Sequence, residues 1–149
     1  MQKRVKEKTE ENERNATKAL NLCKEARDLI RIRKPRQAEP LLLAALEISP
    51  KNPYVLVALG DTKRMQKQFT PATEYYQRCL EADPLNPFAM SGLGDAYRGS
   101  NHLDRAIGIW TQALEAYPEN NLVMTRLADA LTKKGKLTDA RRIYEKAID

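Results

Sequence analysis

Proline and asparagine recur in this sequence at a fixed interval of 34 residues. Each of three prolines is followed two residues later by an asparagine, giving the pairs Pro50 and Asn52, Pro84 and Asn86, and Pro118 and Asn120. A period of this length is typical of arrays of helical repeats, in which each unit packs mainly against its neighbours. The period therefore predicts an all-α fold built as a stack of similar units.

The period divides the chain into four units in register. They span residues 19–52, 53–86, 87–120 and 121–149, and the last stops five residues short of the full length. Side-chain size recurs at matching positions: one column holds Ala38, Ala72, Ala106 and Ala140, and another holds Leu42, Tyr76, Trp110 and Tyr144. Small and large columns that recur together indicate that the units pack in the same way.

Each unit is predicted to be a pair of helices. In the third unit, residues 89–97 and 106–114 each carry an apolar stripe at helical spacing, with a turn between them. A glycine inside a helix costs roughly 1 kcal/mol relative to alanine. We therefore expect Gly60 and Gly94 to be there for close packing of the two helices.

The start of the second helix of a pair can be predicted from residues that favour helix caps and first turns. Thr70 and Thr138 precede residues that suit a first turn, so we expect them to be N-caps. Pro40 lies five residues after Pro35, which suits a helix start. Because proline removes a helical hydrogen bond, we expect Pro40 to bend or delay that helix.

The third unit carries the residues that connect this chain with a known family: Met90, Leu93, Gly94, Tyr97, Ala106, Trp110, Ala113 and Pro118. In this order and spacing they closely resemble the tetratricopeptide repeat. Other units depart from the pattern, with Lys63 at an aromatic position, Cys79 at a small position and Glu25 at a leucine position. The resemblance implies a right-handed superhelix of antiparallel helix pairs that acts as a scaffold for protein–protein interaction.

Residue types that carry out catalysis are scarce. His102 is the one histidine, and the sequence has no phosphate-binding loop, no HExxH and no G-x-S-x-G motif. Cys79 is predicted to be a packing residue, and Cys23 either packs or presents a thiol on the inner face. Neither cysteine has a CxxC partner or a nearby histidine. We expect no enzyme activity, no cofactor and no metal site.

Residues 1–18 form a charged extension before the repeats. Val5 is isolated there until Ala16. Two states stay open for the segment: a helical extension, favoured because lysine and glutamate are good helix formers, or a disordered tail. Without an apolar stretch it is not a secretory signal, and no run of about 18 apolar residues predicts a membrane span. These features predict a cytoplasmic protein.

In the tetratricopeptide family the first helix of each pair lines a concave groove, and the resemblance therefore implies a partner-binding groove on those helices. Counting positions within each unit gives the predicted groove residues Leu20, Cys23, Arg27, Tyr54, Val57, Asp61, Arg64, Phe88, Ser91, Asp95, Arg98, Leu122, Thr125 and Asp129. They include one apolar row, one row of aspartates and one row of arginines. The implied partner is a peptide or a helix of another protein.

Two interpretations of the charged rows stay open, and both can hold. The aspartates and arginines form ion pairs between neighbouring first helices, which would contribute about 0–1 kcal/mol each if exposed. Alternatively, they offer donors and acceptors to a ligand. One family ligand is excluded: the positions of the clamp that holds a chaperone C-terminal carboxylate carry Cys23, Arg27, Ala58, Phe88 and Gly92 here.

Charge distribution suggests a less favoured function. Residues 1–52 carry 13 basic and 8 acidic residues, and the excess gathers at Arg27, Arg31, Arg33, Lys34 and Arg36. Such a cluster is compatible with nucleic-acid binding. No aromatic residue interleaves with it, however, so we do not expect nucleic acid to be the partner.

The C-terminal end of the sequence indicates an alternative class of function. The sequence ends directly after Tyr144, Ala147 and Ile148, without a further helix to cover the last pair. Repeat arrays commonly close with a polar cap, so this end is predicted to expose an apolar strip, including Leu131. Such a strip is either the cut edge of an excised domain or an interface for another copy, and the alternative function is therefore self-assembly into a homo-oligomer through this open end.

Overall fold

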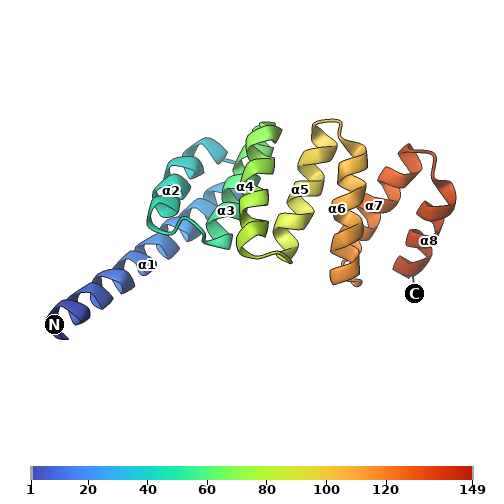
Figure 1. Ribbon diagram of the computed structural model, residues 1–149. Helices are drawn as coiled ribbons and strands as arrows, with labels where there is room; N and C mark the ends of the chain where they lie inside the picture. Colours follow the sequence, from blue (N-terminus) through green and yellow to red (C-terminus); the bar gives the residue numbers. More distant parts are fainter. Residues whose placement is uncertain (1, 149) are drawn as a thin grey trace.

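The computed structural model describes residues 2–148, with side chains through residue 146. Eight helices follow one another in a row (Figure 1). They are α1 Gln2–Arg31, α2 Pro35–Ile48, α3 Pro53–Met65, α4 Phe69–Ala82, α5 Pro87–Gly99, α6 Leu103–Ala116, α7 Asn121–Lys133 and α8 Leu137–Ile148. The all-α fold and the pairing of helices within each repeat are confirmed, because α1 packs with α2, α3 with α4, α5 with α6 and α7 with α8.

The recurring asparagines begin the first helix of three repeats. Asn52 Oδ1 accepts a hydrogen bond from the Tyr54 amide at 2.9 Å. Asn86 and Asn120 cap α5 and α7 in the same way. Since a helix leaves its first amides without partners, a side-chain acceptor at this position fixes where each helix starts. The 34-residue period is therefore a period of helix starts.

The turn inside each pair repeats just as regularly. Arg33, Lys67, Asn101 and Gly135 all have a positive φ, between 60° and 77°. Only glycine adopts this left-handed conformation without steric cost. Three of the four repeats therefore accept some backbone strain in order to reverse the chain at the same position.

Two expectations about the second helices were wrong. α4 begins at Phe69 and α8 at Leu137, so Thr70 and Thr138 lie within the first turn and are not N-caps. α2 begins at Pro35 and continues through Pro40. The expected delay was therefore wrong: Pro40 lies inside the helix, where its missing N–H leaves the Arg36 carbonyl without its usual intrahelical donor.

The core consists of the small and large columns. Ala38, Ala72, Ala106 and Ala140 are buried, as are Leu42, Tyr76 and Trp110, whereas Tyr144 in the last repeat is 39% exposed. A Cβ on Gly60 would overlap the Tyr76 ring, and one on Gly94 would overlap the Trp110 indole. The expected role of these glycines is confirmed: each lets an aromatic ring lie directly against a helix backbone.

The stack curves toward its first helices. Beyond the contacts between chain neighbours, α1 packs against α3 and α3 against α5. Within residues 2–148, no comparable packing joins two even-numbered helices. α1, α3 and α5 are therefore the more closely spaced layer of the stack. The faces of α1, α3, α5 and α7 that point away from the second helices are here called the inner surface.

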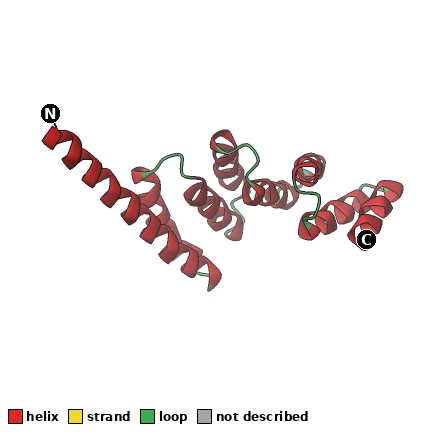
Figure 2. Cartoon of the chain, turned by 90° about the horizontal axis from the view of Figure 1, so that it is seen from below, coloured by secondary structure: helices red, strands yellow, loops and turns green. Residues whose placement is uncertain are grey.

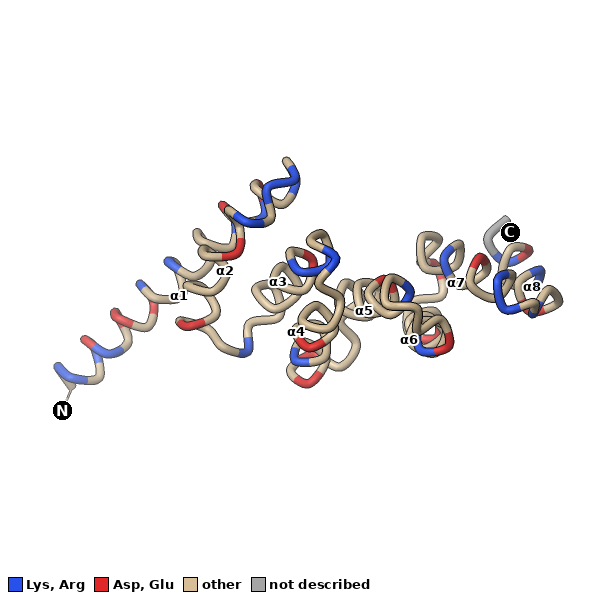
Figure 3. The backbone as a smooth tube through the Cα atoms, turned by 90° about the horizontal axis from the view of Figure 1, so that it is seen from above, with Lys and Arg blue, Asp and Glu red and all other residues tan. Residues whose placement is uncertain are grey.

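The N-terminal half of α1 projects beyond the repeats. Figure 2 shows α1 as one straight helix that continues past the rest of the stack. Of the two states considered for this extension, the structure has the helical one for residues 2–18, and all of them are exposed. Basic and acidic residues are interspersed along it (Figure 3). Burial begins at Ala19, where α1 first packs against the repeats.

Candidate protein-binding groove

Four large apolar side chains are exposed at equivalent positions on the four inner helices. Leu20, Tyr54, Phe88 and Leu122 are 52%, 71%, 69% and 57% exposed. Each is the second residue of its repeat, so the row, here called the apolar row, lies at the N-terminal ends of α3, α5 and α7 and inside α1, which begins earlier, at Gln2. These four side chains neither cap a helix nor belong to the hydrophobic core.

A hollow of about 400 Å³ lies at the first step of the apolar row. Leu20 and Tyr54 line it together with Cys23, Lys24 and Arg27. The Cys23 thiol is buried at the inner surface, and burial raises its pKa. A thiol in this state is an apolar part of the surface rather than a nucleophile.

Beside the apolar row, the second repeat holds a closed polar network. The Tyr76 hydroxyl donates to Asp61 Oδ1 and accepts from Arg64 Nε at 3.1 Å. Arg27 of α1 reaches the other carboxylate oxygen of Asp61 at 3.2 Å. Burial, with the neighbouring Asp61 carboxylate, raises the pKa of Tyr76 well above its usual range. The hydroxyl therefore stays protonated and donates.

The third repeat has no such hydroxyl, because Trp110 occupies the column of Tyr76. Asp95 is 6% exposed and lies among three guanidinium groups. The nearest atoms are Nη1 of Arg126 at 2.7 Å, Nη2 of Arg98 at 3.5 Å and Nη1 of Arg64 at 4.0 Å. Asp95 Oδ1 accepts no hydrogen bond from the described residues.

Burial dominates the electrostatics of this cluster. It raises the pKa of Asp95, although the three arginines oppose the shift. Burial also lowers the pKa of Arg126, although Asp95 opposes that shift. The carboxylate and the guanidinium groups are thus partly desolvated at the floor of the inner surface, where charge interactions are stronger than in water.

The rows of aspartates and arginines form ion pairs between some of the neighbouring inner helices. Arg27 pairs with Asp61, and Arg64 lies 4.0 Å from Asp95, so two steps of the predicted ladder between inner helices exist. At the third step, Asp129 accepts a hydrogen bond from Tyr144. Instead, Arg126 of α7 forms an ion pair with Asp95 of α5, the preceding inner helix.

Three predicted groove residues, Val57, Cys23 and Asp95, are buried and expose little surface to a ligand. Val57 is 3% exposed and packs in the core between α3 and α5, and Cys23 is 6% exposed. Position counting placed them on the inner face, but the close approach of neighbouring helices covers them. Ser91 is partly buried and accepts a hydrogen bond from Arg126, whereas Thr125 and Asp129 are exposed.

Arg126 and Lys133 were missed as inner-surface residues. They lie on α7 beside Arg98, where the three side chains help to line one hollow of about 280 Å³. Arg126 stands in the column of Lys24, Ala58 and Gly92. An arginine in a column that is otherwise lysine or small residues was the signal that could have identified it.

The basic cluster and the C-terminal end differ from expectation in part. Arg27 and Arg31 are engaged with Asp61 and Asp28, whereas Arg33, Lys34 and Arg36 are exposed. Leu131 is buried, so it is not part of an exposed strip. The side chains of Ala147 and Ile148 lie outside the described residues.

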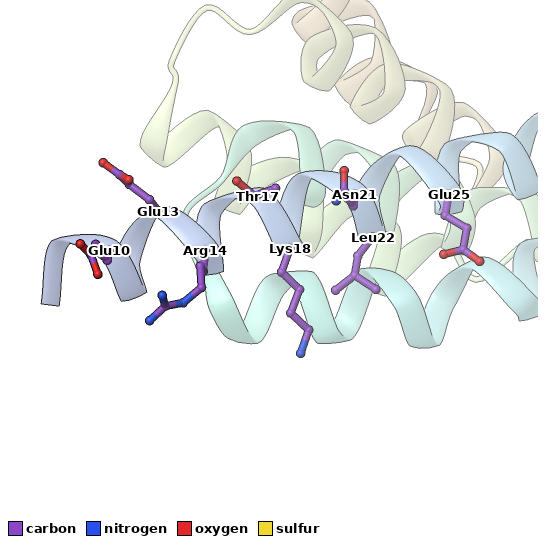
Figure 4. Close-up of a pocket in the computed structure, with 8 residues that line it drawn as sticks. All are labelled: Glu10, Glu13, Arg14, Thr17, Lys18, Asn21, Leu22 and Glu25. Carbon is purple, nitrogen blue, oxygen red and sulfur yellow. The ribbon is translucent and has the colours of Figure 1, made fainter. Parts of the chain in front are cut away.

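A further hollow, of about 660 Å³, lies along the exposed part of α1. Figure 4 shows its lining side chains, which all come from this one helix, with Arg14, Lys18 and Leu22 pointing to the same side. Charges of both signs line it, and no second element closes it. We therefore regard it as the solvated surface of the extension.

Two kinds of site are not found in the part of the chain that the structure describes. No group of three or more histidine, cysteine, aspartate or glutamate side chains is placed to hold a metal ion. No helix there combines the length and apolar character needed to cross a membrane.

Comparison with known proteins identifies the repeats. The tetratricopeptide repeat model matches residues 23–87 and 91–149. No curated protein matches the chain in sequence. Among solved structures, MamA from Desulfovibrio magneticus RS-1 superposes with a TM-score of 0.80 at 20% identity, covering 87% of this chain and 73% of that one.

Two further structures share the fold at similar distance. TTC0263, a thermophilic TPR protein of Thermus thermophilus, has a TM-score of 0.75 at 19% identity, covering 87% of this chain and 73% of that one. A mutant O-GlcNAc transferase of Thermobaculum terrenum has a TM-score of 0.75 at 24% identity, covering 79% of this chain and 23% of that one. At these identities the likeness establishes the fold alone.

Proposed function

Because this chain belongs to the tetratricopeptide repeat family, we propose that it is a non-catalytic scaffold that binds a segment of a partner protein on its inner surface. The supporting observation is the apolar row. Leu20, Tyr54, Phe88 and Leu122 expose more than half of their side chains at one repeat position. Large apolar groups that contribute little to the core are the usual anchors of a protein interface.

The arrangement suits a segment that lies across several repeats. Tyrosine and phenylalanine supply large contact areas and lose little side-chain entropy on binding. Beside them, Asp61, Arg64 and Arg98 place acceptors and donors on the same surface. Such a surface binds an extended or helical segment through apolar anchors and uses polar groups to select it.

A pull-down with matched variants tests this function. The chain with Tyr54→Ala and Phe88→Ala should retain far less partner than the wild type, as read by mass spectrometry, with unchanged helical content by circular dichroism. The control carries Leu43→Ala and Leu85→Ala, two exposed leucines on α2 and in the α4–α5 turn. Equal retention by all three proteins would place the binding surface elsewhere.

Self-assembly is the alternative function. Leu137 is 65% exposed and Tyr144 is 39% exposed, both on α8. If this helix forms an interface between copies, sedimentation equilibrium should give a mass that rises with concentration, and Leu137→Glu should abolish the rise. A strict monomer at high concentration leaves the scaffold function as the better account.

A further inference from the structure

Arg98 is held in place on the inner surface with its hydrogen-bonding capacity unused. Its guanidinium carbon lies 5.5 Å from the centroid of the Trp110 ring. Its one polar contact among the described residues is the 3.5 Å ion pair with Asp95, whose Oδ1 accepts no hydrogen bond. A guanidinium has five N–H donors. Stacking on an aromatic ring orients them without consuming them.

These donors border a hollow that is lined by both apolar and basic side chains. Leu103 and Ala130 form apolar parts of its lining, and Arg98, Arg126 and Lys133 supply three cations. Lys133 is exposed and has no ion pair within residues 2–148. Asp129, the one acidic residue of the lining, accepts a hydrogen bond from Tyr144.

The hollow occurs at one place in the array. Arg64, the equivalent of Arg98 in the second repeat, already bonds to the Tyr76 hydroxyl and to Asp61. Gly92 and Ala58 are the equivalents of Arg126 in the repeats before it. A cationic rim with unused donors therefore forms between α5 and α7 and not between α3 and α5.

We propose that this hollow binds the carboxylate of an acidic side chain on the docked segment. The inference rests on the proposed function and specifies its ligand. Arg98 and Lys133 donate to the carboxylate, Arg126 adds positive charge from the floor, and the methylenes of the acidic side chain lie on Leu103 and Ala130. Guanidinium–carboxylate pairs of this kind are strong because the two planar groups can bond at two points.

A singly charged carboxylate fits the charge of the site better than a phosphate. The carboxylates of Asp95 and Asp129 lie in or beside the hollow and would repel a dianion more strongly than a monoanion. Distance also constrains the ligand. Phe88 and Arg98 are ten residues apart on α5, which corresponds to about 15 Å along the helix. An extended segment spans that distance in about five residues.

Defined peptides provide the probe. Each carries one phenylalanine and one glutamate separated by about two to about eight positions in a serine and glycine background, which covers the expected spacing. Matched peptides replace the glutamate by glutamine or by phosphoserine. Binding is followed by ¹⁵N NMR titration of the full chain, including the arginine Nε–H signals, with wild-type protein and with Arg98→Gln plus Lys133→Gln.

The control protein carries Arg105→Gln. Arg105 likewise lies over an aromatic ring, 5.9 Å from the centroid of Tyr97, but on α6. We expect the glutamate peptide of about five-residue spacing to bind wild type and the control about tenfold more tightly than the glutamine peptide, a preference that falls with salt. The double variant should lose the preference, and circular dichroism should show it to be folded.

Three results overturn the inference. Equal binding of glutamate and glutamine peptides leaves the apolar row as the only determinant and leaves the proposed function standing. Binding of the phosphoserine peptide alone assigns a phosphate to the hollow. No binding by any peptide also overturns it, while the proposed function is decided separately by the pull-down with Tyr54→Ala and Phe88→Ala.

Discussion

The second and third repeats have the same backbone but hold different polar arrangements on the inner surface. In the second, Asp61 lies opposite Tyr76, whose hydroxyl joins the carboxylate to Arg64. In the third, Asp95 lies opposite Trp110, which directs its indole N–H to the Ser91 carbonyl at 3.4 Å instead. Three arginines then gather around Asp95.

The aromatic residue of the core column decides which hydrogen-bonding groups the inner surface offers. Tyrosine satisfies the carboxylate from inside the repeat and engages the neighbouring arginine. Tryptophan fills the core more completely but has no hydroxyl to donate to the carboxylate. The Asp95 carboxylate is therefore paired with arginines, and Arg98 keeps unused N–H donors. A buried aromatic residue of the second helix thus determines which hydrogen-bonding groups remain free on the inner surface, which the first helices form.

The largest effect is expected for the aromatic residue itself. Trp110→Ala should lower the free energy of unfolding by about 3–5 kcal/mol, because the indole is fully buried and leaves a cavity beside Gly94. Chemical denaturation followed by circular dichroism measures the loss. A loss below about 1 kcal/mol would mean that the third repeat does not depend on this ring.

Glycine substitutions test how closely each ring approaches its helix. Gly94→Ala and Gly60→Ala should each cost about 1–3 kcal/mol, because the new methyl group would overlap Trp110 or Tyr76. Gly108, which also lies within a helix, has no atom near its Cβ position. Gly108→Ala should therefore stabilise the chain by about 0.5–1 kcal/mol. The same sign at all three positions would contradict the packing described.

Removing one hydroxyl tests the closed network of the second repeat. Tyr76→Phe should cost about 1–3 kcal/mol, because a buried hydrogen bond to a charged carboxylate is lost and Asp61 keeps its other partner. Tyr144→Phe removes the equivalent hydroxyl in the exposed end repeat and should cost clearly less. Urea denaturation of the two variants should rank them in this order, and the reverse order would refute the comparison.

The smallest expected effect is a dependence on pH in the third repeat. The pKa of Asp95 is raised in the folded state, so its contribution to stability is present in acid and is lost as the pH rises through that value. Asp95→Asn removes this titration. The stability of wild type relative to Asp95→Asn should therefore be greater at about pH 4 than at about pH 7. A difference that stays constant or grows with pH would contradict the raised pKa.

Much of the fold was predictable from the sequence because the same pattern of residues recurs in several repeats. Pro50, Pro84 and Pro118 fixed the period, and the columns of Ala106 and Trp110 identified the two helices that pack. The N-caps were not recognised in Asn52, Asn86 and Asn120, although the sequence displays them. For the second helix of the second repeat, Thr70 was predicted because threonine is a common cap, but the turn that contains the left-handed residue Lys67 places the N-cap two residues earlier, at Gln68.

The candidate groove was less predictable, because position counting gives the face of a residue and not its depth. Tyr54 and Phe88 lie exposed on the inner helices, whereas Val57 and Asp95 on the same face are buried by the approach of the next helix. The contribution of about 0–1 kcal/mol expected for an exposed ion pair therefore does not apply to Asp95, which is 6% exposed. The column of Arg126 marks it as unusual, but its contact with Asp95 depends also on a second column, in which Trp110 supplies no hydroxyl.

The central claim, that the inner helices bind a partner segment, is tested most directly by mapping amide chemical shifts of the chain as the segment recovered in the pull-down is added. The account predicts the largest changes on α3, α5 and α7, at Tyr54, Phe88 and Arg98, with little change on α2, α4 and α6. Changes confined to the even-numbered helices, with the inner surface unaffected, would contradict it.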